Sequence, residues 1–140
     1  QDPNLKGLVL DLRNDPGGLL EGAVAISAAF LPSDAVVVTT NGQISDSKAT
    51  FKAAPEYYLR RGGSDPLRKL PEGVKKVPLV VLVDGDSASA SEIFAAAIKD
   101  NARGDIVGLH TGGNVGVVQS RVDRDQRNAL RLGGGDLRPE

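Results

Sequence analysis

The sequence predicts an α/β fold built on a mainly parallel sheet. Two apolar runs, residues 5–12 and 78–83, are typical of buried strands, and each ends at a glycine-containing turn. Each turn leads into a segment whose apolar residues have helical spacing, at residues 19–30 and 88–102. A shorter strand-like segment, residues 105–108, follows the second helix. Strands that alternate with helices favour parallel pairing, because a helical crossover returns the chain to the same end of the sheet.

Composition argues against several classes of function. The 140 residues suffice for one domain with its own core, which we expect at residues 1–132, with a flexible tail at 133–140. The formal net charge of −1 does not favour nucleic-acid binding. The chain has no cysteine and one histidine, so no metal site is expected. No apolar run approaches the roughly 18 residues of a membrane span.

The first strand and helix are joined by a turn that exposes the backbone. The apolar run at residues 5–12 leads to Pro16, which fixes one φ angle, and then to Gly17 and Gly18, which permit positive φ. The helix at residues 19–30 follows this turn directly. A strand, a sharp glycine turn and a helix are therefore expected in that order.

The middle of the chain is predicted to be the least regular part. A β-branched strand at residues 35–40 is followed by the hairpin signal Asn41-Gly42 and a short return at 43–45. We expect residues 45–77 to form a long loop with one helical turn, and a loop of that length is usually functional or mobile. Its clustered basic residues are expected to be solvated: Arg60, Arg61, Arg68 and Lys69.

The second strand–turn–helix unit carries a run of serines. After the strand at residues 78–83, three serines alternate with single alanines, and Ser89 is the middle one. The helix at 88–102 follows, and a glycine-rich loop spans residues 109–116. The chain is then expected to close with a hairpin, made of strands at 117–122 and 128–132 around a turn at 123–127.

The two glycine turns are predicted to meet at one edge of the sheet. Ligands of open α/β sheets bind outside the carboxyl ends of the strands. If the two apolar strands are neighbours, backbone N–H groups of Gly17 or Gly18 and of Ala90 converge there. Two such donors form an oxyanion hole, and the start of the second helix adds its dipole at the same point.

Ser89 has a second interpretation. The run from Ser89 to Glu92 fits a capping box, with serine at the helix cap and glutamate three residues later. Such a serine completes the hydrogen bonds of the first helical turn and performs no chemistry. The spacing alone leaves helix capping and a nucleophile both open.

Two motifs together resemble one family of enzymes. They are DLRNDPGG at residues 11–18 and SASASEI at residues 87–93. In this order and separation they are similar to the carboxyl-terminal processing peptidases, which are tail-specific serine proteases with a crotonase/Clp-protease type of fold. The resemblance covers residues 5–30 and 78–132, and it implies a core of that fold closed by the C-terminal hairpin.

The resemblance implies roles for individual residues. Ser89 matches the nucleophile. The backbone of three residues matches the oxyanion hole: Gly17, Gly18 and Ala90. Asp100 matches an acidic position in the same helix, where about 16 Å of helical rise separates it from Ser89 and limits it to a supporting role. Gln119 matches the glutamine that orients the catalytic base.

The base that the resemblance implies is missing. These peptidases use a lysine, whose buried amine accepts the serine proton. Counting from Ser89 places Asn114 at that position, and counting back from Gln119 places Val115 there. Neither side chain is a general base. Lys99 is rejected because about 15 Å of helix separates it from the serine, and His110 is retained as a weaker alternative.

The resemblance implies hydrolysis of a polypeptide near its C-terminus, without metal or organic cofactor. It also implies a periplasmic or otherwise exported protein and leaves homo-oligomerisation open. The usual PDZ domain and a targeting segment are absent, which suggests a piece of a longer protein. The missing lysine leaves three explanations: a non-catalytic relative, a truncated or engineered core, or absent loop residues. A peptide-binding or scaffold module without turnover is therefore the alternative function, and a crotonase-type acyl-CoA enzyme is a weaker one.

Overall fold

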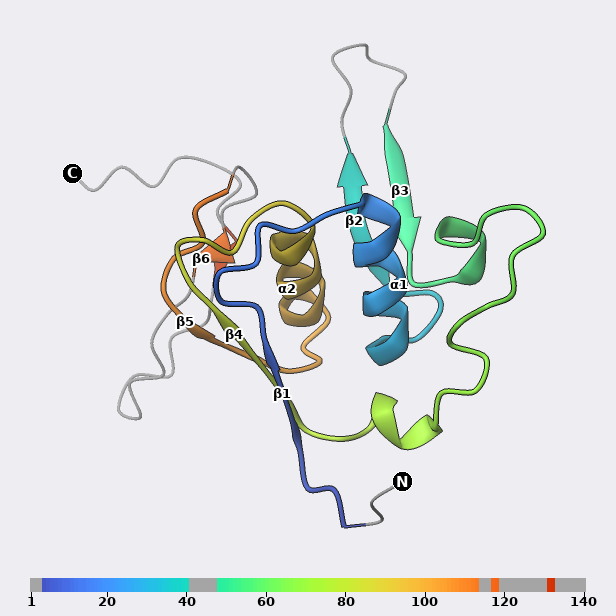
Figure 1. Cartoon of the computed structure of the whole chain (residues 1–140), viewed down its shortest axis with the longest axis horizontal. Coiled ribbons are helices and arrows are strands. Elements are labelled where there is room, and N and C mark those ends of the chain that lie inside the picture. The colour runs from blue at the N-terminus through green and yellow to red at the C-terminus, as the bar shows by residue number, and fades with distance from the viewer. Residues whose placement is uncertain (1–3, 41–47, 114–116, 119–130, 133–140) are drawn as a thin grey trace.

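The computed structural model describes residues 4–40, 48–113, 117–118 and 131–132. The predicted α/β fold with a mainly parallel sheet is confirmed. Three strands form a parallel sheet in the order β1-β4-β5, and two helices provide the crossovers (Figure 1). These elements are β1 (Leu8–Asp11), α1 (Leu20–Phe30), β4 (Leu79–Val83), α2 (Ala90–Asp100) and β5 (Asp105–Gly108).

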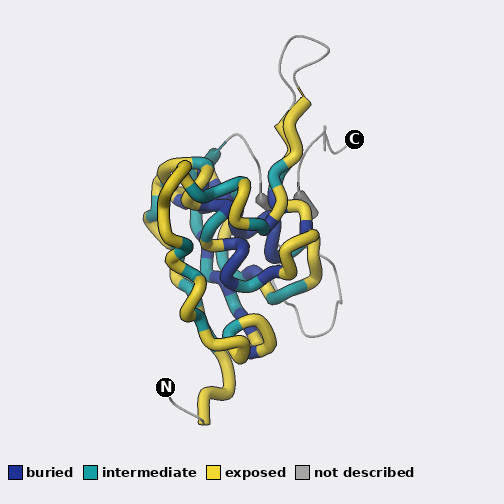
Figure 2. Tube along the Cα trace, turned by 90° about the vertical axis from the view of Figure 1, so that its right-hand side faces the viewer, coloured by how far each residue is buried: buried dark blue, intermediate teal, exposed yellow. Residues whose placement is uncertain are grey.

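The core lies between the parallel sheet and the helices. Alternate residues of β4 are buried at Leu79, Val81 and Val83, because successive side chains of a strand point to opposite faces of the sheet. Phe94 and Ile98 of α2 belong to the same buried cluster. Figure 2 shows the buried segments gathered at the centre of the molecule, with exposed chain around them.

The two helices pack against each other. The rings of Phe30 in α1 and Phe94 in α2 meet edge to face, with centroids 5.9 Å apart. Three consecutive buried alanines reduce the effective diameter of α2: Ala95, Ala96 and Ala97. Small side chains at these positions allow α2 to be enclosed by its neighbours without steric conflict.

The long loop predicted at residues 45–77 is wrong in part. Residues 49–52 form β3 (Ala49–Lys52), which pairs antiparallel with β2 (Val36–Thr40). The predicted return strand at 43–45 lies outside the described residues. Phe51 of β3 contacts Tyr57 edge to face, with ring centroids 6.2 Å apart. Pairing with β2, which lies earlier in the chain, explains a strand that local sequence signals did not reveal.

Two short 3₁₀ helices complete the middle segment, where a single helical turn was predicted. They are η1 (Pro55–Tyr57) and η2 (Glu72–Lys75). The basic cluster is exposed, as expected. It comprises Arg60, Arg61, Arg68 and Lys69.

The predicted closing hairpin is confirmed by its paired ends. β6 (Val117–Val118) and β7 (Arg131–Leu132) are antiparallel. The rest of both predicted strands, their turn at 123–127 and the tail at 133–140 lie outside the described residues. The division of the chain into a core and a tail therefore stays a prediction.

Two basic side chains hold the C-terminal end of α1. Lys75 Nζ donates to the carbonyl oxygens of Ala28 and Leu31, at 3.0 and 2.8 Å. Arg103 donates to Phe30 O at 3.0 Å and lies over the Phe30 ring. The last carbonyl groups of a helix have no partner within the helix, so these side chains supply their hydrogen bonds. Positive charge at this end also interacts favourably with the helix dipole.

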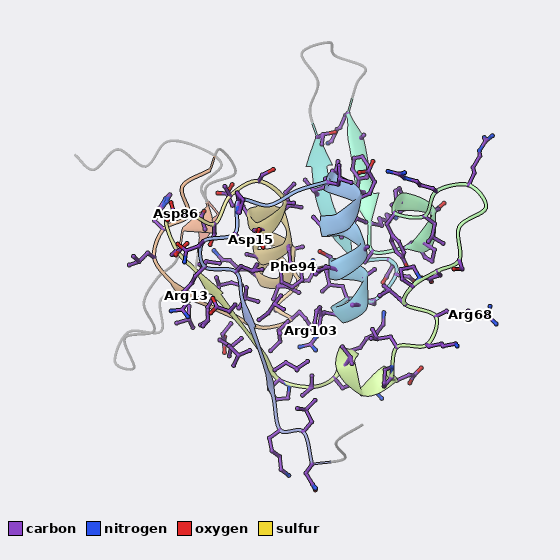
Figure 3. The ribbon with its side chains drawn as sticks, in the orientation of Figure 1. Arg13, Asp15, Arg68, Asp86, Phe94 and Arg103 are labelled. Carbon is purple, nitrogen blue, oxygen red and sulfur yellow. The ribbon has the colours of Figure 1, made fainter. Side chains whose placement is uncertain are left out.

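Arg103 also joins three segments of the chain. Besides Phe30 O, its guanidinium donates to Val74 O and Val77 O, both at 2.8 Å. Figure 3 shows Arg103 at the end of α2 away from Asp15, facing α1. The side chain therefore connects α1, η2 and the start of β4.

Replacement of Arg103 by methionine is expected to lower the free energy of unfolding by about 2–3 kcal/mol. The variant keeps most of the aliphatic stem but leaves three carbonyl groups without their charged donor. Urea denaturation followed by circular dichroism measures the change. Arg61→Met is the control, because substitution of an exposed arginine should change the free energy of unfolding by no more than about 0.5 kcal/mol. Equal losses in the two variants would contradict the role given to Arg103.

Candidate active site

The two predicted turns lie side by side, because β1 and β4 are adjacent parallel strands. Beyond the strands, Ala88 N donates to Asp15 O at 3.0 Å. Gly17 has a φ of 85°, and a Cβ atom there would lie 2.5 Å from Ala88 O and 2.6 Å from Ala90 N. Only glycine permits this conformation and this close approach. In Figure 3, Asp15 and Asp86 mark the two turns beside the start of α2.

Ser87 and Asp84 bind the two turns together. The buried Ser87 hydroxyl donates to Leu12 O at 2.6 Å and accepts from Asp84 N at 3.0 Å. Asp84 Oδ1 accepts from Asn14 N at 3.0 Å and from Ser87 N at 3.1 Å. Ser87 is therefore not equivalent to the middle serine of the motif, since its hydroxyl has a structural role here.

These contacts affect the acidity of Asp84. The N–H of Asn14, assisted by those of Asp86 and Ser87 and by the Ser87 hydroxyl, lowers the pKa of the Asp84 carboxyl, while desolvation opposes the shift. Hydrogen bonds donated to a carboxylate stabilise its charged form. The turn arrangement is therefore most stable when Asp84 is ionised.

Ser89 is exposed at the start of α2 with an unusual backbone conformation. Its φ is 52° and its ψ is −119°, which is rare for a residue other than glycine. Its N–H donates to Glu92 Oε2 at 3.0 Å, in the capping box that the spacing predicts. The glutamate half of the predicted capping box is thus confirmed. The exposed hydroxyl at the positive end of a helix is also where a nucleophile would be placed.

The backbone donors near Ser89 are not equivalent. Gly17 N donates to Asp15 Oδ1 at 2.8 Å, so its hydrogen bond is already made within its own turn. Among the described residues, no acceptor bonds the N–H of Gly18 or Ala90. The local geometry therefore favours Gly18 and Ala90 as the pair available to an oxyanion, and makes Gly17 the residue that permits the close approach.

A pocket of about 240 Å³ opens beside these donors. Its walls come from the end of β1, the start of α1 and the first turns of α2. The residues that make it mainly apolar are Leu12, Leu19, Ala23, Ile26, Ala90 and Phe94. Such a pocket can hold the aliphatic side chain of a bound peptide residue while the backbone carbonyl group of that residue lies near Gly18 and Ala90.

The glycine-rich loop packs on the Ser89 turn through residues that the sequence did not single out. The buried Thr111 hydroxyl donates to Glu92 Oε1 at 2.7 Å. Gly112 lies against the backbone of Gly85, and Gly113 lies against the Glu92 carboxylate. Threonine in a glycine-rich loop is a weak signal by itself, and its partner lies 19 residues away in sequence.

Among the described residues, neither Asp100 nor His110 forms a hydrogen bond with Ser89. Asp100 is the last residue of α2, at the far end of an eleven-residue helix. Partial burial raises the pKa of Asp100, and the Lys99 ammonium opposes the shift. The exposed His110 ring makes its contact with the backbone, where Nδ1 lies 2.7 Å from Thr111 O. Asn114, Val115 and Gln119 lie outside the described residues.

Comparison with known proteins identifies the family. The family model described as Peptidase family S41 matches residues 1–138. The chain belongs to this peptidase family. It is 38% identical over 128 residues to the "Carboxy-terminal-processing protease" of Bartonella bacilliformis, covering 91% of the chain and 26% of that protein. It is 34% identical to "Carboxyl-terminal-processing peptidase 3, chloroplastic" of Arabidopsis thaliana, covering 93% of the chain and 22% of that protein.

Solved structures agree with this assignment. The photosystem II D1 C-terminal processing protease matches with a TM-score of 0.52 and 31% identity, over 82% of this chain and 25% of that protein. A lipoprotein from Streptococcus agalactiae matches with a TM-score of 0.59 and 25% identity, over 82% of this chain and 37% of that protein. The predicted Clp-protease-like fold is confirmed. The chain spans about a quarter of the length of its curated relatives.

Two further findings concern the described residues alone. No group of three or more histidine or carboxylate side chains there could hold a metal ion. No helix in the same part of the chain is both long and apolar enough to cross a membrane.

Replacement of Asp84 by asparagine is expected to destabilise the protein in a pH-dependent way. The lowered pKa means that the ionised group stabilises the fold above its ordinary pKa of 3.8, and that this contribution is lost as the pH falls through the folded value. The difference between the two proteins in unfolding free energy should thus be greatest near neutral pH and shrink below about pH 4. Urea denaturation over this pH range measures it. The neighbouring Asp86→Asn is the control, and a pH-independent Asp84 effect would refute the assignment.

Proposed function

We propose that this chain is the catalytic core of a serine-type endopeptidase that acts on the C-terminal regions of polypeptides. Ser89 is the nucleophile, and the N–H groups of Gly18 and Ala90 form the oxyanion hole. The observation that carries the proposal is the close approach of Gly17 to the backbone of Ala88 and Ala90, beside an exposed serine at a helix start. Membership of the peptidase family supports the same chemistry.

The reaction would follow from this arrangement. The Ser89 oxygen attacks the carbonyl carbon of the scissile peptide, and its proton passes to a base. Negative charge develops on the carbonyl oxygen, which the two N–H groups stabilise, and one such donor contributes about 2.7–4 kcal/mol in known cases. The leaving amine departs with a proton, and water then hydrolyses the acyl-enzyme.

A polypeptide fits the surface around Ser89. The apolar pocket would take one side chain of the substrate. A second hollow of about 430 Å³ lies between α1 and the segment from Tyr57 to Arg60, and Leu19 and Gly22 line both hollows. Because an extended chain advances about 3.3 Å per residue, one substrate segment could contact both. The relatives named carboxyl-terminal-processing proteases suggest that this segment lies near a C-terminus.

The proposed catalytic site lacks the lysine that would act as the general base. Asn114 occupies the position matched to lysine, and a carboxamide does not accept a proton near neutral pH. We expect the unmodified chain to react slowly for this reason. Two residue roles stay predictions, namely base orientation by Gln119 and a supporting role for Asp100. An exported location and a homo-oligomer also stay predictions.

A second candidate is a non-catalytic peptide-binding module of the same fold. The presence of Asn114 favours it, because a groove and an oxyanion site need no base to bind a peptide. The two candidates differ in whether the Ser89 hydroxyl is reactive, and that difference can be measured directly.

A fluorophosphonate probe is expected to label the unmodified chain slowly at Ser89. Probes of this class react with a serine whose attack is assisted by an oxyanion hole. Mass spectrometry of the labelled peptide identifies the site. Ser89→Ala should abolish labelling, and Ser33→Ala, at an exposed serine away from the turn, should not. If the unmodified chain does not label but still binds peptides, the non-catalytic module is supported instead.

Replacement of Asn114 by lysine is expected to increase the labelling rate and peptide hydrolysis by about 100-fold or more, the usual contribution of a general base. Asn114→Arg is the matched control. It adds a similar positive charge, but arginine does not lose its proton and should give no gain. Equal gains in both variants would indicate a charge effect, and no gain in either would exclude position 114 as the site of the base.

A further inference from the structure

Glu92 is the only fully buried charged side chain among the described residues, with an exposed fraction of 0%. It lies in the first turn of α2, where a capping glutamate is expected. Burial of a carboxylate is unfavourable unless its oxygens receive hydrogen bonds. Complete burial at this position therefore requires an explanation beyond the capping of one helix.

The two carboxylate oxygens of Glu92 bond to different parts of the chain. Oε2 accepts from Ser89 N at 3.0 Å, and Oε1 accepts from Thr111 Oγ1 at 2.7 Å. Thr111 is 2% exposed and belongs to the glycine-rich loop. Hydrogen bonds to an ionised group are about twice as strong as neutral ones. One side chain thus connects the serine turn to a loop 19 residues further along.

The loop approaches Glu92 so closely that it leaves no room for a side chain. A Cβ atom on Gly113 would collide with both the Oε2 atom and the carboxyl carbon of Glu92. A Cβ atom on Gly112 would collide with the carbonyl of Gly85, in the turn before Ser89. Helix capping alone explains neither this contact nor the bond to Thr111.

We propose that Glu92 is a positioning residue that joins the Ser89 turn and the glycine-rich loop into one rigid unit. Its carboxylate holds the Ser89 N–H and so helps to maintain the unusual φ of Ser89, which directs the neighbouring Ala90 N–H. Thr111 holds the other oxygen and prevents the carboxylate from turning away. The catalytic consequence rests on the function proposed above, whereas the mechanical coupling does not.

The coupling is tested by substitution of Thr111 and measurement at Ser89. Thr111→Val removes the hydroxyl at nearly constant volume, and it should speed amide hydrogen exchange at Ser89 about tenfold or more, relative to the buried strand amide of Val81. Thr111→Ser keeps the hydroxyl and should restore exchange to within about twofold. If Thr111→Val leaves Ser89 exchange unchanged, Glu92 acts only as a helix cap and the proposal is wrong.

A second pair of variants tests the same unit from the loop. Gly113→Ala places a methyl group against the carboxylate and should also speed exchange at Ser89. Gly73→Ala is its control, because a Cβ atom there enters open space. This pair decides the question if Thr111→Val does not fold. Faster exchange at Ser89 in Gly113→Ala alone supports the proposal, and equal exchange in both variants overturns it.

The catalytic consequence has its own readout. Fluorophosphonate labelling of Ser89 should slow about tenfold in Thr111→Val and recover in Thr111→Ser. Retained labelling alongside faster exchange would show that the coupling exists but does not position the reactive groups, which overturns the positioning role. If the unmodified chain does not label at all, the proposed function fails, and the exchange measurements alone decide the coupling.

Discussion

The parallel pairing of β1 with β4 is the constraint on which the candidate site depends. Asp11 lies opposite Leu82 in this pairing, so both strands end at the same edge of the sheet. The two turns that follow are therefore neighbours, although Asn14 and Asp84 are 70 residues apart in sequence. Ser87 and Asp84 then fix the turns with hydrogen bonds across this edge. The contacts between the first glycine turn and the serine turn therefore depend on this register.

The candidate oxyanion site is made of backbone, and this explains its sequence requirements. Backbone N–H groups can converge only where chains approach without side chains between them, as at Gly17. The same argument applies to Gly112 and Gly113, which bring the second loop against the Ser89 turn. Such a site persists whatever residue occupies position 114. The described fold and the pocket beside Ala90 therefore form independently of whether a proton acceptor is present.

In the positioning role proposed for it, Glu92 serves folding and function together. Its capping bond to Ser89 N is a local interaction that the motif predicts, while its bond to Thr111 is a long-range one. A carboxylate is stable in a buried position only while both of its oxygens accept hydrogen bonds. Loss of the bond from Ser89 N or from Thr111 should therefore weaken the other bond. This mutual dependence makes the serine turn and the loop one structural unit.

The sequence by itself determined the strand–turn–helix order, the glycine requirement at the first turn and the capping box at Ser89. These features depend on local conformation, namely periodicity, permitted φ angles and hydrogen bonds within one helical turn. Only the tertiary structure decided that the backbone of Gly17 approaches that of Ala88 and Ala90. It also revealed β3 within the predicted loop, and Thr111 as the partner of Glu92. Those outcomes depend on contacts between distant segments, which no local pattern encodes.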